Sequence, residues 1–266
     1  RDRTEPNAGS DASAIETTAV RDNGDYILNG NKVFVTNGHV SGTNLIFANT
    51  RPGEKKKEYT VFFVESEREG VEKGPLEDLM GMRGNPVCPI SLHDCRVPEE
   101  NRLGEVGQGL KIALATLNGG RIGIAAQALG IAQASMEEAI RYANQRQQFG
   151  VPLSRHQAIQ MMIADMATQV DAARMMIYRA AWLKDQHQTF TKASAQAKLF
   201  ASEAAGKVTD LAVQIHGGYG YSKAYPVERY YRDARVTRIY EGTSEIHRMV
   251  IAREAQKDVM SDLHLA

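Results

Sequence analysis

The sequence RVTRIYEGTSEIHR, residues 235–248, places one carboxylate, Glu241, in a tight turn directly before a helical pattern. Gly242 gives this turn a backbone freedom that a residue with a Cβ lacks. Thr243 and Ser244 are residue types that cap helices, and the acidic residue after them falls in a first turn, where the helix dipole favours negative charge. Taken alone, a Glu in a surface loop is the simpler interpretation. A carboxylate on a tight turn before a helix is nevertheless well placed to face a cleft, so Glu241 is a candidate catalytic group.

Composition limits the classes of protein that this chain can represent. The 266 residues are 42% apolar and 24% charged, which is typical of a soluble globular protein with one large domain or two smaller ones. Lys+Arg and Asp+Glu both number 32, so no basic excess indicates a nucleic-acid partner. No apolar run reaches about 18 residues, so we expect no membrane span. Cys88 and Cys95 are interpreted as buried thiols in a reducing compartment, either the cytoplasm of a bacterium or the mitochondrial matrix of a eukaryote.

The first part of the chain, residues 1–104, has the pattern of strands and turns. Short β-branched and aromatic runs occur at residues 25–28, 32–35, 45–48 and 59–64. The dipeptide Asn29-Gly30 lies between two of these runs and predicts a hairpin there. Strands without intervening helices predict an N-terminal antiparallel β-sandwich or barrel domain.

The second part, residues 105–266, has the pattern of long helices joined by short loops. Helical spacing of apolar residues extends over about 107–147, 156–184 and 192–216. A short polar helix to about residue 234, the Glu241 turn and a last helix to about residue 257 follow. The sequence therefore predicts an α+β protein whose C-terminal domain is an antiparallel four-helix bundle.

Several familiar sites have no support in this sequence. There is no HExxH or CxxC motif, so no metal site is expected. No GxGxxG follows a strand and opens a helix, and residues 217–220, GGYG, are interpreted as a close-approach turn instead. Arg121 follows small residues in the first long helix, and Arg146 ends that helix. Each arginine is either a clamp for an anionic ligand or an ordinary helix or surface cation.

Short blocks recur in a fixed order: TEPNAGSD at 4–11, GNKVFVTN at 30–37, RG at 83–84, VP at 97–98, LG at 103–104, NGGR at 118–121, RQQFG at 146–150, HQ at 156–157, QIHGGYGY at 214–221 and YEGTSE at 240–245. Any one block is weak, but their order and spacing together are specific. They resemble the motifs of the acyl-CoA dehydrogenase family across essentially the whole chain. The short-chain and related medium-chain branches are the most similar.

The resemblance implies a flavoenzyme of fatty-acid β-oxidation that oxidises an acyl-CoA thioester to the trans-2-enoyl-CoA. Glu241 would abstract the α-proton, and the β-hydride would pass to N5 of FAD. The backbone N–H of the base residue and a flavin hydroxyl polarise the thioester carbonyl in this family. Some relatives carry the base just before the position of Arg121, but here that residue is Gly120, which leaves Glu241.

The resemblance also assigns binding roles to individual residues. The residues expected to bind FAD are Thr4, Phe34 and Thr36 near the isoalloxazine, Thr243 and Glu245 near the adenosine side, and Arg146, Gln148, Phe149, Gln157, Gln214, Gly217 and Gly218 at the pyrophosphate and adenine. Those expected to line the acyl-CoA site are Ser10, Asn118, Arg121 and Gly242. Part of the cofactor site would come from a neighbouring subunit, which implies a homotetramer built as a dimer of dimers. Reduced flavin would pass its electrons to electron-transfer flavoprotein.

The family has an N-terminal helical domain ahead of the TEP block, and this sequence lacks it. We therefore expect a fragment with weakened or absent activity, and restoring the upstream domain should raise FAD affinity and turnover. Two other functions remain open. One is an acyl-CoA oxidase, in which oxygen reoxidises the flavin. The other is a non-catalytic subunit that keeps the fold for assembly.

Overall fold

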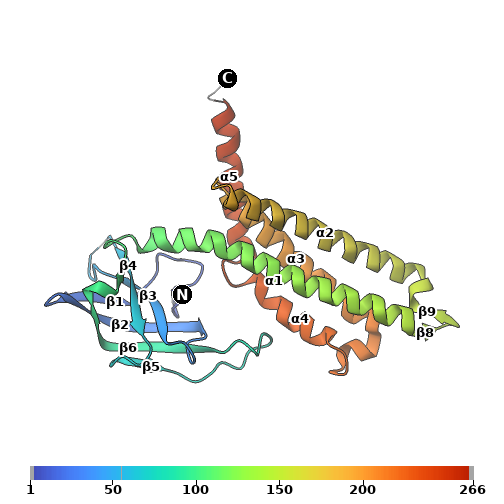
Figure 1. The fold of residues 1–266 in the computed structure, drawn as a ribbon, viewed down its shortest axis with the longest axis horizontal. Helices are drawn as coiled ribbons and strands as arrows, with labels where there is room; N and C mark the ends of the chain where they lie inside the picture. Colours follow the sequence, from blue (N-terminus) through green and yellow to red (C-terminus); the bar gives the residue numbers. More distant parts are fainter. Residues whose placement is uncertain (1–2, 55, 264–266) are drawn as a thin grey trace. The chain divides into compact units, whose positions relative to one another are not determined.

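The computed structural model describes residues 3–54 and 56–263 and forms two compact units, Arg1–Ala115 and Thr116–Ala266 (Figure 1). The first unit is built on a β-sheet and the second on helices, which confirms the predicted α+β class. Across the described residues, no helix combines the length and apolar character needed to cross a membrane.

The sheet unit contains one seven-stranded sheet with the order β5-β6-β2-β1-β3-β4-β7. The predicted arrangement is antiparallel, and five of the six neighbouring strand pairs in this sheet are antiparallel. The exception is β1, which pairs with β3 in parallel through Thr18 and Asn49. Its core includes the tilted rings of Tyr26 and Phe62, whose centroids lie 4.8 Å apart. The strands are β1 (Thr18–Asp22), β2 (Asp25–Thr36), β3 (Thr43–Asn49), β4 (Tyr59–Glu65), β5 (Val71–Lys73), β6 (Val87–Pro98) and, after the short helix η1 (Glu99–Asn101), β7 (Arg102–Leu103).

The hairpin predicted at Asn29-Gly30 is wrong. These residues lie inside the continuous strand β2, where the pairing with β6 shifts register between Leu28 and Gly30. A Cβ on Gly30 would lie 2.4 Å from Oγ1 of Thr17, so glycine permits a close approach here rather than a chain reversal. The actual hairpin joins β1 to β2 through Asn23-Gly24, whose φ angles of 50° and 91° are both left-handed, as a two-residue turn of this kind requires.

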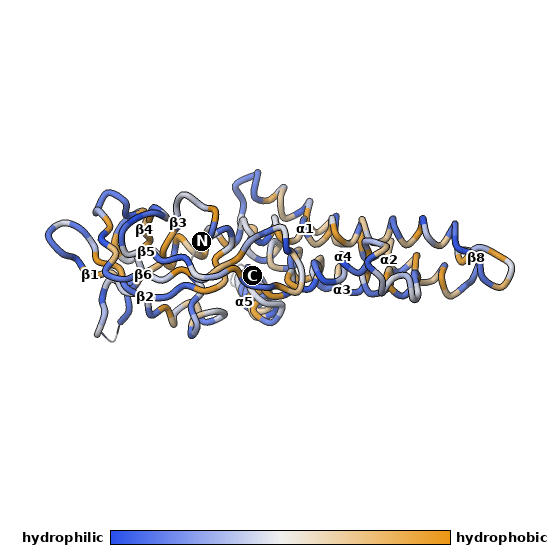
Figure 2. Tube along the Cα trace, turned by 90° about the horizontal axis from the view of Figure 1, so that it is seen from below, coloured by the Kyte–Doolittle hydropathy of each residue, from blue (hydrophilic) through white to orange (hydrophobic). Residues whose placement is uncertain are grey.

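The first three long helices of the helical unit, residues 109–145, 157–185 and 191–216, pack around one core rich in alanine. Short orange and blue stretches alternate along these helices in Figure 2, as expected where one face is buried. Met166, Val170 and Ile177 lie in this core, which confirms the helical spacing of apolar residues predicted over 156–184. The elements are α1 (Gly109–Gln145), which begins in the first unit, β8 (Gln147–Gln148), β9 (Val151–Pro152), η2 (Leu153–Arg155), α2 (Gln157–Asp185), α3 (Thr191–His216), η3 (Gly217–Tyr221), α4 (Val227–Arg235), η4 (Val236–Arg238) and α5 (Ser244–Leu263).

Two smaller predictions are also confirmed. Cys88 and Cys95 are buried free thiols. Residues 217–221 form the short helix η3, in which a Cβ on Gly220 would lie 2.4 Å from the Val213 carbonyl oxygen. This glycine therefore marks a close backbone approach, as its sequence context indicates.

Candidate active site

The turn that carries Glu241 has an unusual backbone. Glu241 and Gly242 both have left-handed φ angles, 54° and 96°. A non-glycine residue in this region is uncommon and persists only where its surroundings hold it. A Cβ on Gly242 would lie 3.1 Å from the ring of His247, so glycine also provides room. The Thr243 hydroxyl accepts a long hydrogen bond of 3.4 Å from the N–H of Ile246 and caps α5, as predicted.

A buried lysine binds the backbone of this turn. Lys198 of α3 is fully buried, and its Nζ donates a hydrogen bond of 2.6 Å to the carbonyl oxygen of Gly242. Burial lowers the pKa of Lys198 to about 8. The nearby negative charge of Glu241 opposes this decrease, and the positive charge of Arg121 reinforces it. The ammonium thus contacts the backbone of the turn and lies within the electrostatic influence of Glu241 and Arg121.

His247, the fourth residue of α5, packs its ring against Gly242 of the same turn. Its side chain is fully buried, and among the described residues neither ring nitrogen has a hydrogen-bond partner of good geometry. Burial lowers its pKa to about 3, and the positive charges of Lys198 and Arg121 act in the same direction. The backbone of Gly242 acts in the opposite direction but does not offset them. His247 is therefore neutral near pH 7.

This histidine predicts an acid sensitivity of the folded chain. The folded pKa of about 3 lies below the ordinary value of 6.5, so stability is lost as pH falls from 6.5 towards 3. Each pH unit below 6.5 costs about 1.4 kcal/mol of folding free energy, so at about pH 5 the folded chain has lost about 2 kcal/mol. We expect His247→Gln to remove this part of the decrease, measured by urea unfolding at about pH 7 and pH 5. The exposed His39 gives the control His39→Gln, and an equal pH dependence in all three proteins would contradict the prediction.

Further polar contacts fix the two sides of the turn. Before it, the hydroxyl of Tyr240 donates to Oε1 of Gln127 on α1, and burial raises the pKa of Tyr240. After it, the hydroxyl of Ser244 donates to Oε1 of Glu203 at 2.8 Å. Glu203 also forms an ion pair with Arg238 at 3.6 Å. The Ser244 hydroxyl is thus bound to Glu203 on α3, and Thr243 makes the capping hydrogen bond of α5.

The residues predicted to line the acyl-CoA site lie partly in this region. Arg121 is only 6% exposed, and its Nη1 donates to Oδ1 of Asn118 at 2.9 Å. Asn118 in turn donates to the hydroxyl of Thr191 at the start of α3, at 3.1 Å. The helical unit therefore brings Arg121, its partner Asn118 and the Glu241 turn into one charged, largely buried region.

A separate cavity of about 660 Å³ in the helical unit gathers other predicted residues. Glu241 is not part of its lining. Five residues predicted to bind FAD do line it, namely Arg146, Gln148, Gln214, Gly217 and Gly218, together with Tyr142, Leu153, Ile159, Ile215, His216, Tyr219 and Ser222. Most of the predicted site residues of the helical unit thus form two groups, one at the turn and one at this cavity.

The chemistry of the cavity suits a ligand with phosphate groups and a heteroaromatic ring. The guanidinium of Arg146 lies 5.8 Å from the ring centre of Tyr219, and the side-chain amides of Gln148 and Gln214 add hydrogen-bond donors. Nδ1 of His216 lies 2.8 Å from the Ala212 carbonyl oxygen, so Nε2 is left as a buried acceptor with no partner among the described residues. Burial lowers the pKa of His216, which keeps this acceptor unprotonated. The donor set therefore fits part of a dinucleotide such as FAD.

Other predicted residues lie elsewhere. Phe149 is 95% exposed on the β8–β9 turn, and Gln157 is the exposed first residue of α2; neither lines the cavity. Thr243 and Glu245 lie at the start of α5. A hydrogen bond from the backbone lowers the pKa of Glu245, as expected in a first helical turn.

The sheet unit holds the remaining predicted residues. The carbonyl oxygen of Thr4 accepts a hydrogen bond of 2.9 Å from the N–H of Val33. The next residue of β2, Phe34, has a left-handed φ of 55° and a 60% exposed side chain. Thr36, at the end of β2, is also exposed, and Ser10 lies in an exposed bend. The sheet thus brings Thr4 beside the segment that carries Phe34.

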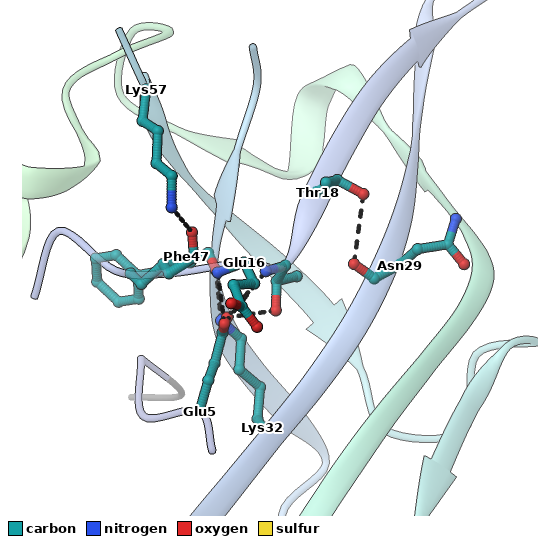
Figure 3. Close-up of polar contacts among 9 residues, drawn as sticks. Glu5, Glu16, Thr18, Asn29, Lys32, Phe47 and Lys57 are labelled. Carbon is teal, nitrogen blue, oxygen red and sulfur yellow. Dashed lines mark hydrogen bonds and ion pairs between the residues drawn. The ribbon is translucent and has the colours of Figure 1, made fainter. Parts of the chain in front are cut away.

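A buried ion pair attaches this N-terminal segment to the sheet (Figure 3). Glu5 is 3% exposed, and its Oε1 lies 2.6 Å from Nζ of Lys32. The carboxylate also accepts hydrogen bonds from the N–H groups of Glu16 and Thr17, at 2.6 and 3.1 Å. Nζ of Lys32 donates to the Phe47 carbonyl oxygen at 2.6 Å. Burial alone would raise the pKa of Glu5, but Lys32 and the hydrogen bonds lower it.

Sequence reasoning did not find several of these residues. Lys198 carries a weak signal, because it is a charged residue inside an alanine-rich run. Gln127 carries none, because it lies 113 positions from its partner Tyr240. His247 and His216 also lack a local signal, since only tertiary packing buries their rings.

Two family models match the chain. Residues 2–95 match "Acyl-CoA dehydrogenase, middle domain", and residues 107–256 match "Acyl-CoA dehydrogenase, C-terminal domain". Among curated relatives, acryloyl-CoA reductase (NADH) of Anaerotignum propionicum is 51% identical over 96% of this chain and 65% of its own length. The mitochondrial short-chain specific acyl-CoA dehydrogenase of Rattus norvegicus is 50% identical over 94% of this chain and 60% of its own length. The chain thus spans less than two thirds of either relative.

Solved structures agree with these matches. Butyryl-CoA dehydrogenase of Megasphaera elsdenii has a TM-score of 0.94 at 46% identity, over 96% of this chain and 67% of its own. An acyl-CoA dehydrogenase of Bacillus anthracis in complex with FAD has a TM-score of 0.92 at 35% identity, over 98% of this chain and 48% of its own. The resemblance seen in the sequence motifs is therefore confirmed. This chain belongs to the acyl-CoA dehydrogenase family and contains the family's middle and C-terminal domains.

Proposed function

We propose that the chain is part of an FAD-dependent dehydrogenase that oxidises an acyl-CoA thioester to the trans-2-enoyl-CoA, with a short-chain substrate favoured by the similarity to short-chain relatives. The observation that carries this proposal is the left-handed turn at Glu241. It presents a carboxylate from a backbone that buried Lys198 holds, in the same region as Arg121. A fixed carboxylate of this kind suits abstraction of a weakly acidic proton.

In the proposed reaction, the carboxylate of Glu241 takes the proton from the α-carbon. The backbone N–H of Glu241 donates to the thioester carbonyl and stabilises the negative charge that develops there. Asn118, Arg121 and Gly242, with Ser10 of the sheet unit, would line the acyl-CoA site. When bound, FAD supplies the hydride acceptor at its N5 atom.

The proposed FAD contacts come from the cavity of the helical unit, from the sheet unit and from the start of α5. The residues that line the cavity, Arg146, Gln148, Gln214, Gly217 and Gly218, would hold the pyrophosphate and adenine, with Phe149 and Gln157. Thr4, Phe34 and Thr36 are proposed for the isoalloxazine, and Thr243 and Glu245 for the adenosine side. Because part of this set would serve a neighbouring subunit, we propose a homotetramer that is a dimer of dimers.

The finer points of organisation are also proposals. A domain boundary at residues 104/105 is supported by the interval between the two family models, which end at 95 and begin at 107. We propose that the sheet closes as a sandwich or barrel, and that the C-terminal domain is an antiparallel four-helix bundle. Electron-transfer flavoprotein is the proposed electron acceptor. The proposed location is the bacterial cytoplasm or the mitochondrial matrix.

One relative supports a second candidate, the reverse reaction. Acryloyl-CoA reductase is named for reduction of an enoyl thioester. In that direction Glu241 would give a proton to the α-carbon, because a base in one direction is the acid in the other. Oxidation of chemically reduced flavin by acryloyl-CoA, faster than bleaching of oxidised flavin by butyryl-CoA, would favour this candidate.

The test of the proposed function is the visible absorption spectrum of the purified chain with FAD, before and after anaerobic addition of butyryl-CoA. A flavin spectrum that bleaches supports the dehydrogenase half-reaction. A bound flavin that neither butyryl-CoA bleaches nor acryloyl-CoA oxidises contradicts both candidates. A chain that stays colourless with added FAD contradicts the proposal for these 266 residues and favours an assembly role. Peroxide formation in air would indicate an oxidase.

A further inference from the structure

Lys198 is an unusual residue for its position. It lies on α3 among buried alanines and serines, and its own side chain is fully buried. Burying an ammonium group is costly unless it is paired, so such residues are rare without a specific partner. The partner is a backbone atom, the carbonyl oxygen of Gly242, at 2.6 Å.

That carbonyl lies where the chain leaves the turn and enters α5. The first helical hydrogen bond of α5 goes to the next carbonyl, that of Thr243, from the N–H of His247 at 3.0 Å. Lys198 therefore satisfies a backbone acceptor just outside the helix, and buried acceptors of this kind need a partner. The contact fixes the peptide unit after Gly242, whose φ is 96°.

Four charged groups act on Lys198, from the turn, α1, α3 and α5. Glu241 on the turn, Glu203 on α3 and Glu245 on α5 are negative, and Arg121 on α1 is positive. His247 of α5 lies in the field of Lys198 and is neutral near pH 7. The ammonium thus binds the backbone of the turn and counters the charge of its carboxylate.

We propose that Lys198 is a positioning residue, whose buried ammonium holds the Glu241-Gly242 turn in its left-handed form and so fixes the carboxylate and the amide N–H of Glu241. The inference rests on the proposed function, because it gives the held groups their catalytic roles. It goes beyond that function because it assigns the position of the Glu241 carboxylate to Lys198, a residue on α3.

Two variants separate the components of the contact. Lys198→Met removes both the charge and the hydrogen-bond donor, whereas Lys198→Gln removes the charge and retains a donor. Lys207→Met is the matched control, because Lys207 is exposed on the same helix. The far-ultraviolet circular dichroism of each variant establishes that the helices have formed. If Lys198→Met does not fold, Lys198→Gln carries the test.

The first measurement needs no substrate: amide hydrogen exchange of the peptides that cover residues 236–247. Exchange should be faster in Lys198→Met than in the unmodified chain, intermediate in Lys198→Gln and unchanged in Lys207→Met. In the FAD-bound protein, Lys198→Met should bleach with butyryl-CoA about 100-fold more slowly, the cost of a small misplacement of a reacting group. The unmodified rate should also fall as pH rises through about 8, and Lys198→Gln should lack this decrease.

The outcomes distinguish this inference from the proposed function. Unchanged exchange in the Lys198 variants overturns the inference, whatever the flavin does. A bleaching rate and pH profile in Lys198→Gln equal to those of the unmodified chain also overturn it. If exchange is faster in Lys198→Met but bleaching survives Glu241→Gln, the hold on the turn stands and only the proposed function fails.

Discussion

Glu241→Gln is expected to slow substrate-driven flavin bleaching by about 10²–10⁴-fold, the range over which a positioned general base contributes, while FAD remains bound. Glutamine has nearly the shape of glutamate, so the left-handed turn and its contact with Lys198 should persist. The amide, however, cannot accept the α-proton. The measurement is the rate of loss of flavin absorbance after anaerobic mixing with butyryl-CoA.

A second carboxylate on α5 provides the control. Glu254 lies on α5 beyond the turn and pairs with Arg253 and Lys257, so Glu254→Gln removes a charge from the same helix without touching the turn. Its bleaching rate should equal that of the unmodified chain. Equal rates in Glu241→Gln and Glu254→Gln would exclude Glu241 as the base.

The parts of the fold that follow from local pattern were predictable. The helices α2 and α3 begin and end within a few residues of their expected limits, because apolar spacing and glycine breaks determine them. The Glu241 turn was also evident, since Gly242 and the capping Thr243 are adjacent in sequence. Local signals of this kind need no knowledge of distant contacts.

The parts that depend on distant contacts were not predictable. The sequence has four Asn-Gly pairs, at residues 23–24, 29–30, 37–38 and 118–119. Among the described residues, the pair Asn23-Gly24 makes the hairpin between β1 and β2, whereas Asn29-Gly30 lies inside β2. Gly30 instead accommodates Thr17, and that choice depends on how β2 pairs with β1 and β6. The contact of Lys198 with Gly242 could not be predicted for the same reason, because it forms only when α3 packs against the turn.

Lys32→Met should destabilise the chain by about 3–5 kcal/mol, which is the usual cost of leaving one member of a buried ion pair without its partner. Both side chains are essentially buried, 0% exposed for Lys32 and 2% for Glu5. The variant leaves the Glu5 carboxylate among the N–H groups of Glu16 and Thr17 but without its countercharge. Urea unfolding at about pH 7 measures the loss. Lys73→Met is the control, since Lys73 pairs with Glu67, whose side chain is 87% exposed.

The double variant Glu5→Gln/Lys32→Met distinguishes a buried uncompensated charge from a loss of packing. Glutamine keeps an acceptor for the Thr17 amide but carries no charge, so the double variant should be more stable than Lys32→Met alone. Stability in Lys32→Met should also rise as pH falls, because protonation relieves the isolated carboxylate, whereas the pair in the unmodified chain loses stability as Glu5 protonates. If the double variant is the less stable, packing rather than charge dominates. Because the ion pair attaches the N-terminal segment to the sheet, Lys32→Met should also weaken the hydrogen bond between the Val33 N–H and the Thr4 carbonyl oxygen, next to the exposed Phe34.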